Sequence, residues 1–263
     1  MRILGAIAGA LVLVTAGCGG SGGGGNAAKP TNAIEAAALK TSQIGSVRAD
    51  FALSSSAGVS GTGSGVFNGK DRSAQVTMNV TENGKQVAVD TVIVGNTIYL
   101  RSPLISARLP GGKQWVKLDL RKAAKAGNVD LGSLLSTNPT PGGALAYLQG
   151  STAIKKLGTE NVGGVPTTHY RVVVDLQKAA DHASGSDKEA LEQAIKSTGT
   201  TTVPADVWVD SHGYVRKIDY HLHVSGGSGD LTMELHDFGP PVPITAPGTN
   251  EVVDLLQALG GNG

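Results

Sequence analysis

The feature that most constrains the fold is an alternation of apolar and polar residues, which recurs between residues 47 and 238. In VRADFALSSS, for example, Val47, Ala49, Phe51 and Leu53 are separated by residues that are mostly polar. A period of two predicts half-buried β-strands. The same pattern is found in residues 74–94, 95–102, 114–120, 169–176, 205–224 and 229–238.

Short turn signals join these segments, which predicts an antiparallel sheet. Asn83-Gly84 stands between two alternating runs and is the strongest short hairpin signal. Residues 210–213 and 225–230 are further expected turns. Successive strands joined in this way make an antiparallel sheet with one dry and one wet face, here of about ten strands.

Two helices and a set of shorter segments are expected to cover the dry face. Asn32 and Glu35 form a capping box at the start of a helix in residues 33–44, and Ser186 and Glu189 form another before residues 187–197. Between residues 118 and 154 lie short amphipathic segments, whose leucines need an apolar surface to cover. The expected fold class is therefore α+β, with helices on one side of the sheet only.

The N-terminal residues resemble a bacterial lipoprotein signal. Arg2 precedes an apolar run from Ile3 to Ala16, and these 14 residues are fewer than the roughly 20 that span a bilayer. The small residues Ala16 and Gly17 stand directly before Cys18, the one cysteine of the chain. In a lipobox such a thiol receives a diacylglyceryl unit and the peptide is cut before it, and two acyl chains give stable anchoring. The alternative is a stray or buried cysteine near an ordinary secretory cleavage site.

This interpretation divides the chain into a signal peptide (1–17), a lipidated, flexible, glycine-rich tether (18–31) and a single folded domain (32–263). Cleavage removes Arg2, so Lys and Arg fall from 22 to 21 and equal the 21 Asp and Glu residues. A net charge of zero argues against nucleic acid as a partner, because phosphates need a basic excess. With Cys18 modified, no thiol remains for a disulfide or a thiolate metal site.

No catalytic motif is found, and neither a catalytic residue, a metal nor a cofactor is expected. GTGSG at residues 61–65 has glycine where a nucleophile elbow needs serine, and is interpreted as a turn. His221 and His223 share a strand face, with Thr232 and Glu234 expected opposite them and Asp219 expected opposite His236. That face also carries Lys217, so these residues are expected on the wet side, where histidine–carboxylate pairs are ordinary.

Basic residues gather between residues 101 and 125, where Asp119 is the one acidic residue. Such a cluster fits a basic rim that meets anionic lipid headgroups. The alternative is a solvated surface that the acidic residues of the segment 206–263 balance. The residues of the expected rim are Arg101, Arg108, Lys113, Lys117 and Arg121.

The order of these parts resembles the LppX/LprG lipoproteins of mycobacteria, within the wider LolA-like group. The resemblance covers roughly residues 33–245. It rests on the lipobox, a helix running into SVRADFALSSS, NTIYLRSP followed by KQWVKLDL, GTENVGGVPTTHYRVVVDL, and VPADVWVDSHGYVRKIDY. It implies a curved half-barrel whose cavity takes the acyl chains of a lipid or lipoglycan for carriage across the envelope. It also implies an extracytoplasmic, membrane-anchored protein of an actinobacterial envelope.

Alternation identifies the residues expected to line the cavity, although it does not separate a hollow core from a filled one. From the strands they are Phe51, Leu53, Val76, Met78, Val80, Ile93, Leu100, Val116, Leu118, Ile218, Tyr220, Leu222, Met233 and Leu235. From the covering segments they are Leu134, Leu135, Leu145 and Leu148.

Four functions remain open at this point. A lipid carrier is favoured, as a monomer whose partners are its cargo, the membrane and an envelope transporter or regulatory protein. A sensing or regulatory module of the same fold would have a dry core and no lipid. An enzyme would need a polar cluster inside the concavity, and a structural envelope protein is the last alternative.

Overall fold

The computed structural model describes most of the chain beyond residue 29. The described residues are 30–69, 73–82, 84–119, 141–183, 199–224 and 227–255, with Lys188, Leu191, Glu192, Ile195 and Lys196. The predicted signal peptide, most of the tether, Leu134, Leu135 and Arg121 lie outside these residues, as does most of the helix predicted over residues 187–197.

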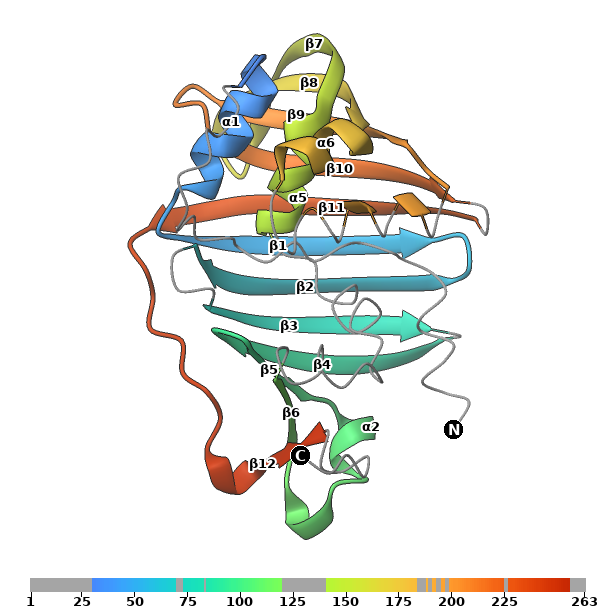
Figure 1. The fold of residues 1–263 in the computed structure, drawn as a ribbon, viewed down its shortest axis with the longest axis vertical. Coiled ribbons are helices and arrows are strands. Elements are labelled where there is room, and N and C mark those ends of the chain that lie inside the picture. The colour runs from blue at the N-terminus through green and yellow to red at the C-terminus, as the bar shows by residue number, and fades with distance from the viewer. Residues whose placement is uncertain are drawn as a thin grey trace.

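A single twelve-stranded sheet dominates the described part of the chain (Figure 1). Its spatial order is β12-β6-β5-β4-β3-β2-β1-β11-β10-β9-β8-β7. All neighbours are antiparallel except β12 and β6, which are parallel. The strands are β1 (Ser46–Ser55), β2 (Val59–Asn68), β3 (Ser73–Glu82), β4 (Lys85–Val94), β5 (Thr97–Arg101), β6 (Trp115–Asp119), β7 (Ser151–Val162), β8 (Val165–Asp175), β9 (Thr202–Asp210), β10 (Val215–Val224), β11 (Gly227–Gly239) and β12 (Val252–Asp254).

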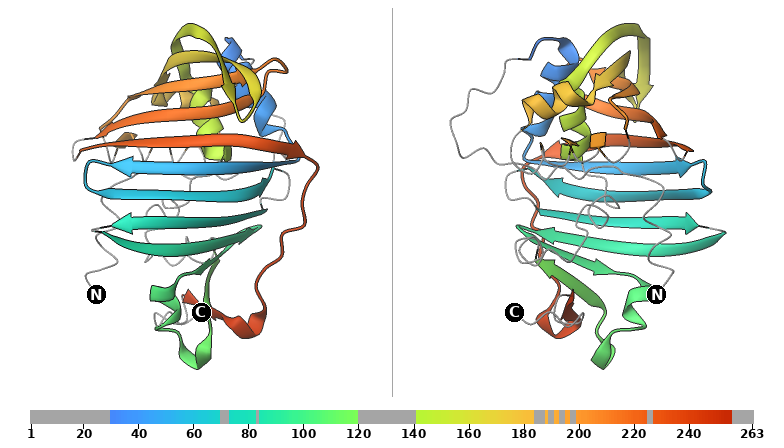
Figure 2. Two further views of the ribbon diagram at one scale, coloured as in Figure 1. Left: turned by 180° about the vertical axis from the view of Figure 1, so that it is seen from behind. Right: turned by 45° about the vertical axis from the view of Figure 1, so that its right-hand side comes forward.

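Helices α1 (Ala33–Ser42), α5 (Pro141–Tyr147) and α6 (Leu176–His182) lie together on one side of the sheet, over the half that contains β8–β11 (Figures 1 and 2). Helix α2 (Pro103–Ser106) lies apart from them, beside β4 and β6. Single 3₁₀ turns follow at η2 (Pro110–Gly112), η3 (Leu148–Gly150) and η4 (Thr249–Glu251). The predicted curved sheet with helices on one face is confirmed.

Helix α1 starts at the predicted cap. The Asn32 side chain accepts hydrogen bonds from the backbone N–H groups of Ile34 and Glu35, while the Glu35 carboxylate accepts from the Thr31 N–H. Glu35 is fully buried, and Lys178 of α6 donates to it at 2.6 Å. Burial by itself raises the pKa of Glu35, but the hydrogen bonds from Lys178 and Thr31 outweigh it and lower that pKa. A capped helix end and a buried ion pair thus fasten α1 to α6.

The interpretation of residues 61–65 as a turn is wrong, because they lie in the middle of β2. Gly61, Gly63 and Gly65 occupy its inward positions, opposite Leu53, Phe51 and Ala49 of β1. A Cβ atom on Gly63 would lie 2.5 Å from the Thr77 carbonyl oxygen and 2.7 Å from Cγ of Met78. Glycine is therefore required where β2 and β3 approach closely. With glycine at three successive inward positions, β2 shows no apolar alternation there, although Phe67 near its end is buried in the core.

About ten strands were predicted and the sheet has twelve, and the absence of alternation explains this difference too. β7 is an edge strand whose outward and inward positions are largely polar, and β12 has only three residues. Neither offers the alternation that predicts a strand. The predicted hairpin at Asn83-Gly84 is confirmed, since β3 and β4 pair from Glu82–Lys85 onward.

After β11 the chain runs along one end of the sheet to its far edge, where β12 pairs with β6 (Figure 1). Asn68, buried at the end of β2, holds this segment by exchanging two hydrogen bonds with the backbone of Val242. Trp115, Val92 and Val252 form a second apolar cluster beneath it. The C-terminal segment is therefore packed onto the sheet.

Candidate functional site

The apolar residues predicted to line a cavity lie on one face of the sheet, the face that the helices cover. Cross-strand pairing places Ile218, Met233, Phe51, Gly63 and Met78 opposite one another in β10, β11, β1, β2 and β3. Residues directly opposite share a face. The apolar surface thus crosses the middle of the sheet without a break.

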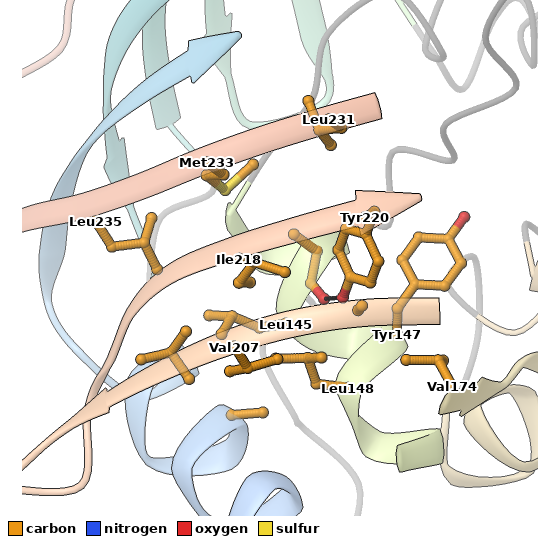
Figure 3. Packing of buried hydrophobic residues seen from close by; sticks show 14 of the residues in the cluster. Leu145, Tyr147, Leu148, Val174, Val207, Ile218, Tyr220, Leu231, Met233 and Leu235 are labelled. Atoms are coloured by element: carbon orange, nitrogen blue, oxygen red, sulfur yellow. Dashed lines mark hydrogen bonds between the residues drawn. The ribbon is translucent and has the colours of Figure 1, made fainter. Parts of the chain in front are cut away.

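Most of these side chains belong to one cluster of buried residues. Leu145 and Leu148 enter it from α5 and η3 and meet Ile218, Met233 and Leu235 from the sheet (Figure 3). The predicted residues in this cluster are Phe51, Val76, Met78, Leu145, Leu148, Ile218, Tyr220, Met233 and Leu235, with Leu53, Val80, Ile93 and Leu222 half-buried against it. Val116 and Leu118 are also buried, and Leu100 is half-buried.

Tyr220 is the polar group at the centre of this face. Its hydroxyl donates to the carbonyl of Ala144 in α5 at 2.6 Å, and its ring meets Tyr147 edge-on (Figure 3). Burial raises the pKa of Tyr220 well above its usual value, so the phenol stays neutral. The hydroxyl therefore fastens α5 to the sheet.

Several residues of this face were not among those predicted from the sequence. Val172 and Val174 of β8, Val203, Ala205 and Val207 of β9, and Leu231 of β11 are all buried in the main cluster. The alternation in residues 203–207 and 172–174 was the signal that would have found them.

The basic residues expected to form a headgroup rim have protein partners in most cases. Arg101 binds Asp90 and lies over the ring of Trp115, Lys117 lies 3.5 Å from Asp254, and Lys113 donates to the carbonyl of Val252. Arg108 is exposed. Three of these cations therefore stabilise the end of the sheet that carries β6 and β12.

On the opposite face of the sheet, acidic and histidine side chains alternate across five neighbouring strands. Glu160 of β7 contacts His169 of β8 at 2.9 Å, His169 contacts Asp206 of β9 at 2.7 Å, and Asp206 contacts His221 of β10 at 3.4 Å. His221 then contacts Asp230 of β11 at 2.9 Å. These five residues are called the acid–histidine row below.

Further side chains and hydrogen bonds support most members of the row. Trp208 donates to Glu160 and stacks on the imidazole of His169, with the ring centres 4.2 Å apart. Hydrogen bonding to Trp208 lowers the pKa of Glu160, and hydrogen bonding to Asp230 raises the pKa of His221. Burial by itself raises the pKa of Asp206, but hydrogen bonds from His169 and Arg171 lower it further than burial raises it.

The wet-face position predicted for His221 is confirmed, but the predicted partners are wrong. His221 pairs with Asp230, Asp219 with Thr232, and Glu234 with Lys217. His236 instead contacts Asp50 of β1. The β10–β11 turn is tighter than expected, with Val224 opposite Gly227, and this shifts the register. Within the described ranges, no group of three His, Cys, Asp or Glu side chains is arranged to hold a metal ion.

None of the described helices is long and apolar enough to cross a lipid bilayer. The geometry defines a class: an open, curved antiparallel sheet with an apolar face under a few helices. Comparison with known families agrees, because the model of the LppX_LprAFG lipoproteins matches residues 29–244. The chain belongs to the LppX_LprAFG lipoprotein family.

Two mycobacterial lipoproteins are among the solved structures similar to this chain. The crystal structure of the Mycobacterium tuberculosis lipoprotein LppX superposes with a TM-score of 0.50 at 16% identity, covering 81% of this chain and 96% of that one. LprF from Mycobacterium bovis has a TM-score of 0.49 at 14% identity, covering 82% and 95%. At these identities the comparison with LppX supports the fold alone.

A curated relative in Streptomyces griseus is an uncharacterized 31.2 kDa protein of the rplA-rplJ intergenic region. It is 31% identical over 155 residues, which are 57% of this chain and 50% of the relative. The match thus spans about half the length of that relative.

Proposed function

We propose that this lipoprotein binds the acyl chains of a lipid or lipoglycan against the helix-covered face of its sheet and carries that lipid across the cell envelope. One observation carries the proposal. The apolar surface runs from β9 to β3 and continues on β4, β5 and β6, whereas the described helices α1, α5 and α6 lie over the β8–β11 half (Figure 1). On the other half, Val80, Ile93 and Leu100 are only half-buried.

This apolar surface suits acyl chains. Lipid-binding sites are concave and mainly apolar, with few polar contacts. The buried residues at the inward positions of β1, β3 and β10 are aliphatic or aromatic, and the central hydroxyl of Tyr220 is already bonded to Ala144. Membership of the LppX_LprAFG family supports the same proposal.

The test places a large side chain on this face. Val80 points inward and is half-buried, while its neighbour Asn79 points outward and is exposed. Mature Val80→Trp and Asn79→Trp proteins are purified from their own host, and bound lipid is extracted and identified by mass spectrometry. Val80→Trp should lose bound lipid while keeping its melting temperature, and Asn79→Trp should keep both.

A filled core predicts a different result. Overpacking by Val80→Trp would then destabilise the protein by about 1–3 kcal/mol, and no lipid would be found on the parent. That combination would refute the carrier and favour a sensing or regulatory module with a dry core.

A further inference from the structure

An open pocket of about 670 Å³ lies at the end of the sheet where α1 ends, β10 begins and β11 ends. None of the functions assigned above uses it. Cationic and aromatic side chains share its lining, and the chemically distinctive ones are Lys40, His212, Tyr214, Arg216 and Phe238.

Aromatic rings hold the two permanent cations of this pocket in place. Nζ of Lys40 lies 4.6 Å from the centre of the Tyr214 ring, and Cζ of Arg216 lies 4.3 Å from the centre of the Phe238 ring. The two rings contact one another, with centres 5.4 Å apart. Such contacts limit the freedom of long cationic side chains. The cations are therefore positioned before any ligand arrives.

Two β-bulges bring these side chains together. The β9–β10 register shifts between Val215 and Lys217, and Arg216 lies within that shift. The β1–β11 register shifts between Ser46 and Arg48, and Phe238 lies within it, next to Asp237, whose φ is 49°. Bulges redirect side chains, and strained backbone of this kind is concentrated at functional sites. Two neighbouring strands thus depart from regular pairing at the point where they form the pocket.

The charge of the pocket favours an anion. Asp210 is its acidic neighbour, and its buried carboxylate is already bonded to Nε of Arg216 at 2.7 Å and to the backbone N–H groups of His212 and Tyr214. Within the described part of the chain, no acceptor is bonded to the terminal amino groups of Arg216, and Lys40 donates only to the His212 carbonyl. Donors on both cations remain for a ligand.

The pocket also borders the main apolar cluster, because Phe238 packs against that cluster. An anion bound here would therefore lie next to the surface proposed for acyl chains. A phosphate group accepts charge-assisted hydrogen bonds from Lys and Arg. We propose that this pocket binds the phosphate group of a lipid, with Lys40 and Arg216 as its ligating cations. The claim that the phosphate belongs to a lipid rests on the proposed function, whereas the claim that the pocket binds phosphate does not.

Calorimetric titration of the mature protein in a neutral detergent tests whether the pocket binds phosphate. Glycerol 3-phosphate is the probe, and glycerol is its uncharged counterpart. Lys40→Gln should weaken glycerol 3-phosphate binding about tenfold or more, the loss expected for one charge-assisted hydrogen bond. Lys156→Gln is the matched control, since Lys156 is an exposed lysine of β7 that does not line the pocket, and β8 and β9 separate its strand from β10. Equal affinity of the two variants, or equal binding of glycerol, would overturn the proposal.

A second titration separates a lipid from a free phosphate ester. Dihexanoylphosphatidylglycerol should bind more tightly than glycerol 3-phosphate, because its acyl chains can contact the apolar cluster that borders the pocket. If both probes bind with equal affinity and Lys40→Gln weakens the binding of both, the ligand is not a lipid. The proposed function is then rejected, and the pocket is a site for soluble phosphate esters. If the acyl chains increase the binding affinity but Lys40→Gln has no effect on it, the pocket is not the phosphate site, and the proposed function is supported.

Discussion

Single glycines determine how closely β2 can approach its neighbours. Three successive inward positions of this strand, Gly61, Gly63 and Gly65, carry no side chains, so Leu53, Phe51 and Met78 from β1 and β3 occupy the space above them. Glycine normally weakens a strand, and its presence in a strand interior marks a close approach of another group. At Gly63 that group is the carbonyl of Thr77.

We expect Gly63→Ala to destabilise the protein by about 1–3 kcal/mol, because the added methyl group must displace β3 backbone or Met78. Gly158→Ala is the control, since a Cβ atom there meets nothing within 4 Å. Urea denaturation of both variants measures the difference. Equal stability of the two would show that β2 and β3 can separate without cost.

At the scale of elements, the acid–histidine row links β7, β8, β9, β10 and β11 across the face opposite the helices. Hydrogen bonding raises the folded pKa of His221, so its stabilising contribution is complete below about pH 6.5, the unfolded value, and is lost as pH rises through the folded pKa. Asp206 has a lowered pKa, so its contribution is present above about pH 3.9 and is lost as pH falls through the folded pKa.

The melting temperature should therefore be highest between about pH 4 and pH 6.5 and fall towards pH 8. His221→Gln should flatten the fall above pH 6.5, because the titrating imidazole is absent. His212→Gln is the control: His212 is exposed, and its imidazole has no hydrogen bond within the described residues. Calorimetric scans at a series of pH values measure these slopes, and identical slopes for wild type and His221→Gln would contradict the role given to the row.

Elements with regular alternation were predictable from the sequence, and the others were not. Alternation predicts β1 and β3, because their inward positions carry mainly apolar side chains, and the Asn83-Gly84 dipeptide predicts the hairpin that follows β3. The glycines of β2 remove that signal, and β7 is polar along an edge. The register of a hairpin depends on the length of its turn, which the sequence does not specify here. The residues opposite His221 could therefore not be predicted.

The apolar face was largely predictable for the same reason, since alternation assigns a side to each residue. The pocket at Lys40 was not. It joins residues separated by 172 positions, as in the bond from Lys40 to His212, and it depends on two bulges. A bulge breaks the period of two, so the sequence around Arg216 and Phe238 assigns these side chains to no particular side.

At the scale of the whole molecule, the predicted anchor at Cys18 precedes the folded part by a glycine-rich segment. Cys18→Ala should release the protein from membranes or leave an uncleaved precursor, because the thiol that accepts the diacylglyceryl unit is gone. Fractionation of cells into membrane and soluble parts, with the size of the chain read on a gel, measures both results. Normal processing together with retention on the membrane would show that Cys18 is not the anchor.

The pairing of β1 with β11 sets the order in which this protein can fold. Strands β1–β6 pair with neighbours in sequence, as do β7–β11. In the described sheet these two sets join along β1 and β11, where Asp50 and His236 are 186 residues apart. Contacts between such distant residues form slowly. If the chain is exported with its N-terminus leading, as the predicted signal implies, one long edge of β1 stays open until almost the whole chain has crossed, and open edges favour pairing with other chains. The risk of aggregation is therefore expected to be greatest while the chain is incomplete, before its last long strand, β11, pairs with β1.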